Sequence, residues 1–190
     1  MYRGLHRLLL LAALLLLPAK ALRGQDFLLG LFQSPKGVGI TAVFDHGGEM
    51  DLFTLRTDFC GLLSGRTAQI GGIASYSHDY VLLYREMEDF AFSLHAGAGV
   101  MAGWVHDFEN GFFSVYDRQM THNPGIAAGA TGNVGLRVDF ARNITLDLSF
   151  SVCPGIHLRT NKSTGALITS FYKGGLYRAY FPQLNLFYRF

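Results

Sequence analysis

The stretch YFPQLNLFYRF, residues 180–190, alternates apolar and polar side chains over most of its length. Leu184, Leu186 and Tyr188 occupy every second position, and Gln, Asn, Phe and Arg fill the positions around them. A period of two residues places alternate side chains on opposite faces of an extended strand. The segment is therefore predicted to be a β-strand with one apolar face, and it ends in an aromatic residue, Phe190.

The same alternation recurs upstream, whereas a helical period is nearly absent. In residues 144–152 one face is apolar over nine residues, close to the roughly 9–11 residues that a tilted strand needs to cross a bilayer. Pro154 and Pro182 cannot donate ladder hydrogen bonds, so they imply a bulge or an early end of pairing. The predicted strands, eight in all, are residues 36–46, 49–59, 66–76, 80–85, 90–104, 126–140, 144–152 and 180–190.

The terminal strand resembles the C-terminal signal of bacterial outer-membrane β-barrels, which their assembly machinery reads. On that resemblance Phe190, Tyr188 and Leu186 form the assembly signal. Residues 36–190 resemble the eight-stranded barrels of OmpA and OmpX, and the last residues resemble the ends of uncharacterised small barrel proteins. The resemblance implies an all-β fold, a closed antiparallel up-and-down transmembrane β-barrel in the bacterial outer membrane, in contact with lipid and lipopolysaccharide. Closure is also a physical requirement, because an open sheet edge in lipid leaves backbone groups unpaired.

Connection lengths agree with a last strand that ends on the periplasmic side, since such barrels have short periplasmic turns and longer outer loops. The expected long outer loops are 107–124 and 159–174, the short inner turns 60–64, 86–89 and 141–143, and the short outer connections 77–79 and 47–48. Residues 25–35 then remain as a periplasmic N-terminal segment, with an inner plug as the alternative.

Residues 1–24 have the layout of a secretory signal peptide, with early basic residues, a Leu- and Ala-rich run and a cleavage site after Ala21 or Gly24. The secretion machinery is accordingly an expected partner. Cleavage after Gly24 removes four of the 16 basic residues and none of the 14 acidic ones, which leaves a net charge of −2. Because no basic cluster remains, a nucleic-acid partner is not expected.

Charged residues of both signs fall on the face predicted to line the lumen. An eight-stranded barrel has an interior about filled by its own side chains, so a wide diffusion pore is not expected. Buried charges are tolerated when they are paired, and the inward set is expected to pair within the lumen. This predicted lumen polar network comprises Arg56, Asp58, His95, Arg137, Asp139, Asp147 and Arg189. A narrow polar path or a ligand contact is the alternative interpretation.

An enzymatic site is not expected. Ser93 and His95 share the inward face and could form a nucleophile–base pair, but they belong to no recognised motif and are expected to line the lumen. The remaining histidines considered, at positions 78, 106, 122 and 157, lack a spacing typical of a metal site. No cofactor is expected either. Cys60 and Cys153 map near opposite rims, so both are predicted to be free thiols.

Two functions remain open. The first is a non-enzymatic membrane anchor whose outer loops, residues 107–124 and 159–174, bind a partner, a surface or lipopolysaccharide. The second is a narrow channel or small-molecule transporter. A soluble lipocalin-like barrel is disfavoured, because the outward face of residues 144–152 carries no polar side chain.

Overall fold

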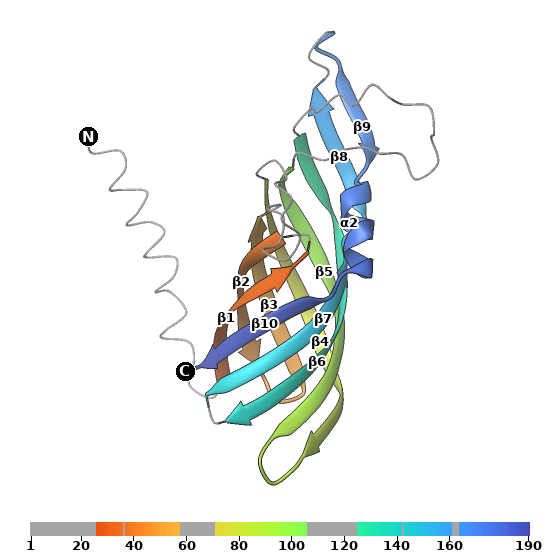
Figure 1. Ribbon diagram of the computed structural model, residues 1–190. Helices are drawn as coiled ribbons and strands as arrows, with labels where there is room; N and C mark the ends of the chain where they lie inside the picture. The colour runs from red at the N-terminus through yellow and green to blue at the C-terminus, as the bar shows by residue number, and fades with distance from the viewer. Residues whose placement is uncertain (1–25, 36, 58–70, 106–124, 142, 161–163) are drawn as a thin grey trace, which may run out of the picture.

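The computed structural model describes residues 26–35, 37–57, 71–105, 125–141, 143–160 and 164–190 (Figure 1). Its sheet closes into an antiparallel barrel of eight strands, because β1 pairs with β10 and β5 pairs with β6. The barrel strands are β1 (Asp26–Ser34), β2 (Gly37–Asp45), β3 (Glu49–Thr57), β4 (Gly72–Glu86), β5 (Ala91–Val105), β6 (Gly125–Ala141), β7 (Ile144–Val152) and β10 (Gln183–Arg189). The fold class predicted from the sequence is confirmed.

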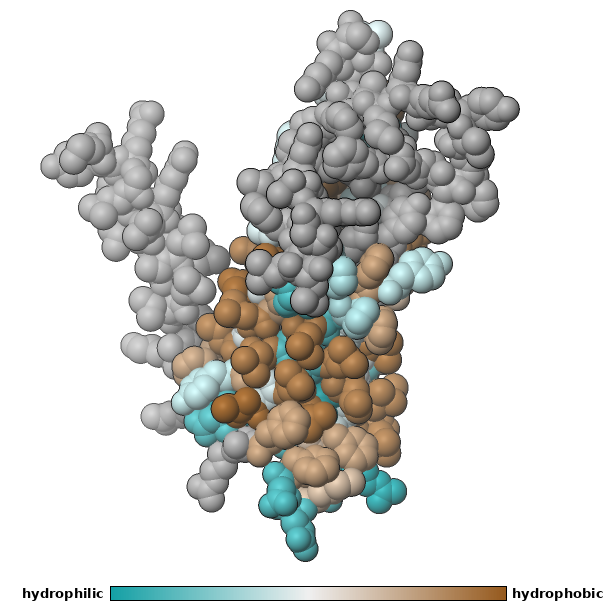
Figure 2. Space-filling view, in the orientation of Figure 1, coloured by the Kyte–Doolittle hydropathy of each residue, from teal (hydrophilic) through white to brown (hydrophobic). Residues whose placement is uncertain are grey.

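Side chains alternate between the lumen and the outer surface, as β7 illustrates. Thr145 and Asp147 are buried inside, whereas Ile144, Leu148 and Phe150 are at least 40% exposed on the outside. Figure 2 shows the result as a band of apolar side chains around the visible face of the barrel, with hydrophilic side chains below it. Such an apolar exterior over a polar interior is the arrangement of a lipid-facing barrel.

Residues 26–34 form β1, so the expectation that residues 25–35 are a periplasmic segment or an inner plug was wrong. This strand pairs with β2 on one side and β10 on the other. Leu28 and Phe32 are buried in the lumen, while Leu29 and Leu31 are exposed on the outer surface. Because both faces of this strand are apolar, the sequence has no period of two and the strand escaped prediction.

Strand β4 is continuous from Gly72 to Glu86, so the predicted connection at residues 77–79 does not exist. The polar side chains of Ser77 and Asp79 do not mark a connection. Both face the lumen and are buried there. The ladder with β5 is irregular only between Val81 and Leu83, at a β-bulge. The prediction divided β4 into two strands and missed β1. These two errors cancelled, so the predicted count of eight strands was right.

The corrected strand map also moves the turn at residues 46–48. Since β1 starts at the end of the barrel where β10 finishes, the β2–β3 turn lies at that same C-terminal end. The Phe27 ring lies 5.2 Å from Phe44 and 5.7 Å from Phe190. The prediction of an outer turn at residues 47–48 was therefore wrong.

At the opposite end a second hairpin extends the sheet beyond the barrel (Figure 1). Strand β8 (Gly155–Thr160) follows β7 after Pro154 and pairs with β6, and β9 (Leu167–Phe171) pairs with β8. Residues 159–174 are thus partly strand rather than one long loop. The ends of β7 and the start of β10 fall beside Pro154 and Pro182, as the sequence predicted.

A short helix, α2 (Lys173–Tyr177), and a 3₁₀ turn, η2 (Arg178–Tyr180), connect β9 to β10. Cys153 N donates to Gly175 O over 3.1 Å. A Cβ atom at Gly175 would lie 1.9 Å from the Cys153 carbonyl oxygen, so only glycine allows this close approach. Among the described residues, no helix has the length and apolar character required to cross a membrane.

Several predictions fall on residues outside the described ranges. These are the signal peptide at residues 1–24, the inner turn at 60–64, the loop at 107–124, Asp58, Cys60, His106 and His122. Cys153 is described, and it is a buried free thiol.

Candidate functional site in the barrel lumen

A group of ion pairs lies in the lumen at the end of the barrel that carries the C-terminus. Arg137 Nη2 lies 2.9 Å from Asp45 Oδ2, and Arg137 Nε lies 3.8 Å from Asp139 Oδ1. Arg189 Nη2 lies 3.1 Å from the same Asp139 oxygen, and Arg189 Nη1 lies 3.9 Å from Asp26. These pairs connect β1 and β10, the first and last strands of the barrel, to each other and to β2 and β6. They therefore link elements that are far apart in sequence.

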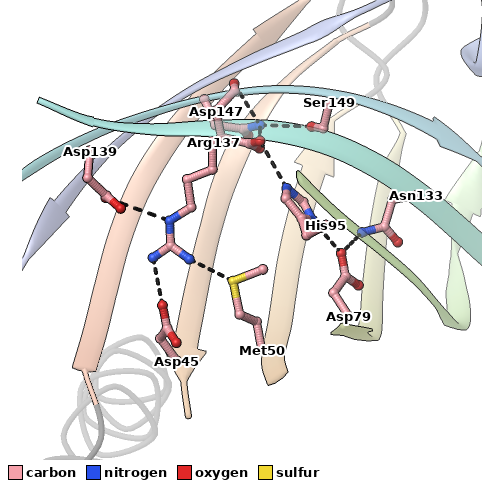
Figure 3. Close-up of polar contacts among 10 residues, drawn as sticks. Asp45, Met50, Asp79, His95, Asn133, Arg137, Asp139, Asp147 and Ser149 are labelled. Carbon is pink, nitrogen blue, oxygen red and sulfur yellow. Dashed lines mark hydrogen bonds and ion pairs between the residues drawn. The ribbon is translucent and has the colours of Figure 1, made fainter. Parts of the chain in front are cut away.

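Deeper in the lumen, His95 lies between two carboxylates (Figure 3). Its Nδ1 is 2.8 Å from Asp79 Oδ2, and its Nε2 is 3.1 Å from Asp147 Oδ1. Asn133 donates to Asp79, and Asn185 Nδ2 donates to Asp147 Oδ2 over 2.7 Å. Only an imidazolium can donate from both ring nitrogens, so the geometry fits a cation shared by two carboxylates.

A polar cavity of about 40 Å³ lies beside the His95 ion pairs. Its hydroxyl lining comes from Thr41, Thr54, Ser75, Ser77, Thr131, Ser149 and Ser151. Arg56 also lines the cavity, and its Nη2 lies 3.2 Å from Ser75 Oγ and 3.7 Å from Cys153 Sγ. A polar space of this size holds about three water molecules.

Apolar side chains lie in the lumen at both ends of this polar section. The cluster nearer the C-terminal end consists of Leu28, Val43, Met50 and Phe187. The cluster at the other end consists of Ile73, Met101, Val105, Ala127, Cys153 and Tyr172. A cavity of about 10 Å³ borders the first cluster, at the lower limit of the volume that one water molecule needs. One apolar cluster therefore lies toward each end of the barrel from the polar cavity.

The structure brings most of the predicted lumen residues together in two groups. Arg137, Asp139 and Arg189 share one ion-pair group, and His95 and Asp147 share the other. Arg56 is buried and lies apart from both, at the hydroxyl-lined cavity.

Sequence reasoning missed four lumen residues, Asp45, Asp79, Asn133 and Asn185. Asp79 was missed because residues 77–79 were interpreted as a connection. Its alternation with Ser77 on the inward face was the signal that could have found it. Asn133 and Asn185 both alternate with apolar residues in the sequence, which puts them on the polar faces of their strands, but an amide alone does not identify its partner.

The pairing of Ser93 with His95 as nucleophile and base has no support in this geometry. Both ring nitrogens of His95 are taken by carboxylates, those of Asp79 and Asp147. His157 belongs to β8, at the end of the molecule opposite the C-terminus. It is buried, and its ring centroid lies 6.4 Å from that of Tyr172. Within the described ranges, no group of three or more His, Cys, Asp or Glu side chains could hold a metal ion.

These features define a class of protein, the small membrane-spanning β-barrel with a filled lumen. No protein-family model and no curated protein matches the chain. Among solved structures, the chain is similar to the N-terminal β-barrel domain of OprF from Pseudomonas aeruginosa, with a TM-score of 0.50 and 9% sequence identity. The match covers 87% of this chain and 97% of the OprF domain. The fold is thus that of an eight-stranded outer-membrane barrel, which agrees with the bacterial outer membrane as the predicted location.

Proposed function

We propose that the protein is a non-enzymatic membrane anchor of the bacterial outer membrane whose connections at the end opposite Phe190 bind a partner at the cell surface. The observation that supports this proposal is the filled lumen, in which two ion-pair groups and two apolar clusters occupy the barrel interior. A barrel of this kind provides rigid support rather than a path. Binding in such proteins is carried by connections on a rigid scaffold.

The β8–β9 hairpin supports the location of the binding surface. It extends beyond the barrel at the end opposite the C-terminus (Figure 1). Leu167 and Phe171 of β9 are 71% and 47% exposed. Exposed apolar side chains on a projecting hairpin are suited to contact a protein or a lipopolysaccharide molecule. Phe190, Tyr188 and Leu186 remain the proposed signal for the barrel-assembly machinery.

A narrow channel is the second candidate, and the hydroxyl-lined cavity of about 40 Å³ is the observation that favours it. Conduction would require water on both sides of this cavity. The two apolar clusters oppose it, because dry apolar constrictions prevent ion passage.

Single-channel recording in planar bilayers tests the choice between anchor and channel. The anchor proposal predicts no steady conductance for the wild type and measurable conductance for the quadruple variant Met50→Ala, Met101→Ala, Tyr172→Ala, Phe187→Ala, which removes large side chains of both apolar clusters. The control Leu148→Ala, Leu184→Ala changes only the outward faces of β7 and β10 and should remain silent. Steady conductance of the wild type would favour the channel.

Shortening the loop at residues 107–124 and the hairpin at 159–174 should abolish binding to lipopolysaccharide-coated surfaces without affecting folding.

A further inference from the structure

Strand β9 has an open edge at the end of the molecule opposite the C-terminus. The strand order of the sheet ends at β9, which pairs with β8 and with no other described strand. Tyr172 N donates to Gly155 O over 2.8 Å, so the backbone groups of Tyr172 and of alternate residues before it point toward β8. The N–H and C=O groups of the intervening residues therefore point to the open edge, and these residues are Leu167, Thr169 and Phe171.

This edge lacks the features that usually protect an edge strand. Natural edges are protected by charged residues, by proline or by a β-bulge. Residues 167–171 have the sequence LITSF, which contains no charged residue and no proline. The ladder between β8 and β9 runs without a register shift from Thr160 to Ile156. Since Leu167 and Phe171 are 71% and 47% exposed, the edge presents apolar side chains together with backbone donors and acceptors.

The edge is complementary to itself. In an antiparallel pair of β9 strands centred on Thr169, this residue lies opposite its own counterpart, and Leu167 lies opposite Phe171 at both ends. Each of these pairs can exchange two backbone hydrogen bonds, because the backbone groups of all three residues point to the open edge. A Thr–Thr pair across strands is favourable, and the Leu–Phe pairs remove apolar surface from water. A second copy of the strand therefore fits the edge in one defined register.

We propose that the β9 edge binds the β9 edge of a second copy of this chain, which lies in a facing membrane. An antiparallel pair of identical strands has a two-fold axis perpendicular to the strands. Figure 1 shows that β9 runs along the long axis of the molecule. Two copies in one membrane are related by an axis along the membrane normal, which would leave their β9 strands parallel. The second copy therefore approaches from the opposite side, with its outer connections toward those of the first.

This inference rests on the proposed function, since it identifies the partner of the same outer connections. A single pair of five-residue strands is small compared with the roughly 1,200–2,000 Å² of a stable interface, so isolated copies should remain monomers. Two membranes that each carry many copies form many such contacts at once. Their combined strength can hold the membranes together although each contact is weak.

Clustering of lipid vesicles that carry the full folded chain tests the proposal. Vesicles with the wild type should aggregate, as measured by light scattering, and vesicles with Thr169→Pro should not. Proline removes an N–H group that points to the open edge, so the β8–β9 ladder keeps its hydrogen bonds. The matched control Thr169→Val keeps this N–H group and should aggregate like the wild type. The heat-dependent gel shift verifies folding, and external protease verifies that the hairpin faces outward.

Mixing vesicles of two colours identifies the partner. Wild-type vesicles should recruit wild-type vesicles at least about fivefold more often than Thr169→Pro vesicles, the loss expected from one backbone hydrogen bond per contact. Equal recruitment of both kinds, or aggregation of Thr169→Pro vesicles alone, would overturn the proposal. Absence of wild-type clusters would also overturn it. If such vesicles still bound lipopolysaccharide-coated surfaces, the self-pairing alone would fall and the anchor proposal would stand.

Discussion

His95 is a shared cation in the middle of the barrel, and its environment makes it difficult to replace. Asp79 and Asp147 approach it from opposite sides, and all three side chains are at most 5% exposed. Removing one member of a buried ionic group leaves a buried charge without a partner. The resulting loss of folding free energy is larger than the net stabilisation that the intact group provides. The inward position of His95 followed from alternation in the sequence. Its partner Asp79 did not, because partners across strands depend on the register and on the unbroken course of β4.

We expect the substitution His95→Gln to lower the free energy of unfolding by about 3 kcal/mol, because two buried carboxylates then lose their common cation. Urea titration of the protein folded in lipid vesicles, followed by the heat-dependent gel shift, measures this change. Ser93→Ala is the control, since Ser93 is buried on the same face of β5 two residues away. A midpoint for His95→Gln equal to that of Ser93→Ala would show that the ion pairs do not stabilise the barrel.

Strand β1 depends on a close approach to β10 at Gly30. A Cβ atom built at Gly30 would lie 2.4 Å from Phe187 Cδ1 and 2.6 Å from the Leu186 carbonyl oxygen. The Phe187 ring is buried in the apolar cluster nearer the C-terminal end of the barrel. It therefore occupies the space that a side chain at Gly30 would need. The sequence could predict β10, β7 and β6 because one face of each is polar. It could not predict β1, whose lumen face is apolar.

The substitution Gly30→Val should destabilise the barrel by about 1–3 kcal/mol, as overpacking does, even though valine is a favourable strand residue. Gly72→Val is the matched control, because no atom lies within 4 Å of a Cβ atom built at Gly72. The yield of folded, gel-shifted protein in vesicles compares the two. If Gly30→Val folded as well as Gly72→Val, residues 26–34 would not pair with β10 as described.

The whole molecule combines a lipid-facing surface, a filled lumen and a projecting hairpin on one closed sheet. Closure depends on the seam between β1 and β10, where Leu31 is the neighbour of Leu186. Alternation in the sequence, with the requirement that no sheet edge is left open in lipid, was sufficient to predict a closed barrel, but the predicted count of eight was right only because two errors cancelled. It was insufficient to locate this seam, because the first strand has no polar face. The same limit reversed the predicted side of the turn at residues 47–48.

Disulfide cross-linking across this seam in isolated outer membranes is the most direct test of the closed barrel. In a Cys60→Ser, Cys153→Ser background, Gln33→Cys and Leu184→Cys should cross-link on mild oxidation, because directly opposite strand residues have Cβ atoms about 4.5–5.5 Å apart. The control pair Leu29→Cys and Leu184→Cys should not, since Leu29 is opposite Tyr188, about 13 Å along β10 from Leu184. Cross-linking of the matched pair alone is the result that the closed barrel predicts. Failure of the matched pair, or equal cross-linking of both pairs, would contradict it.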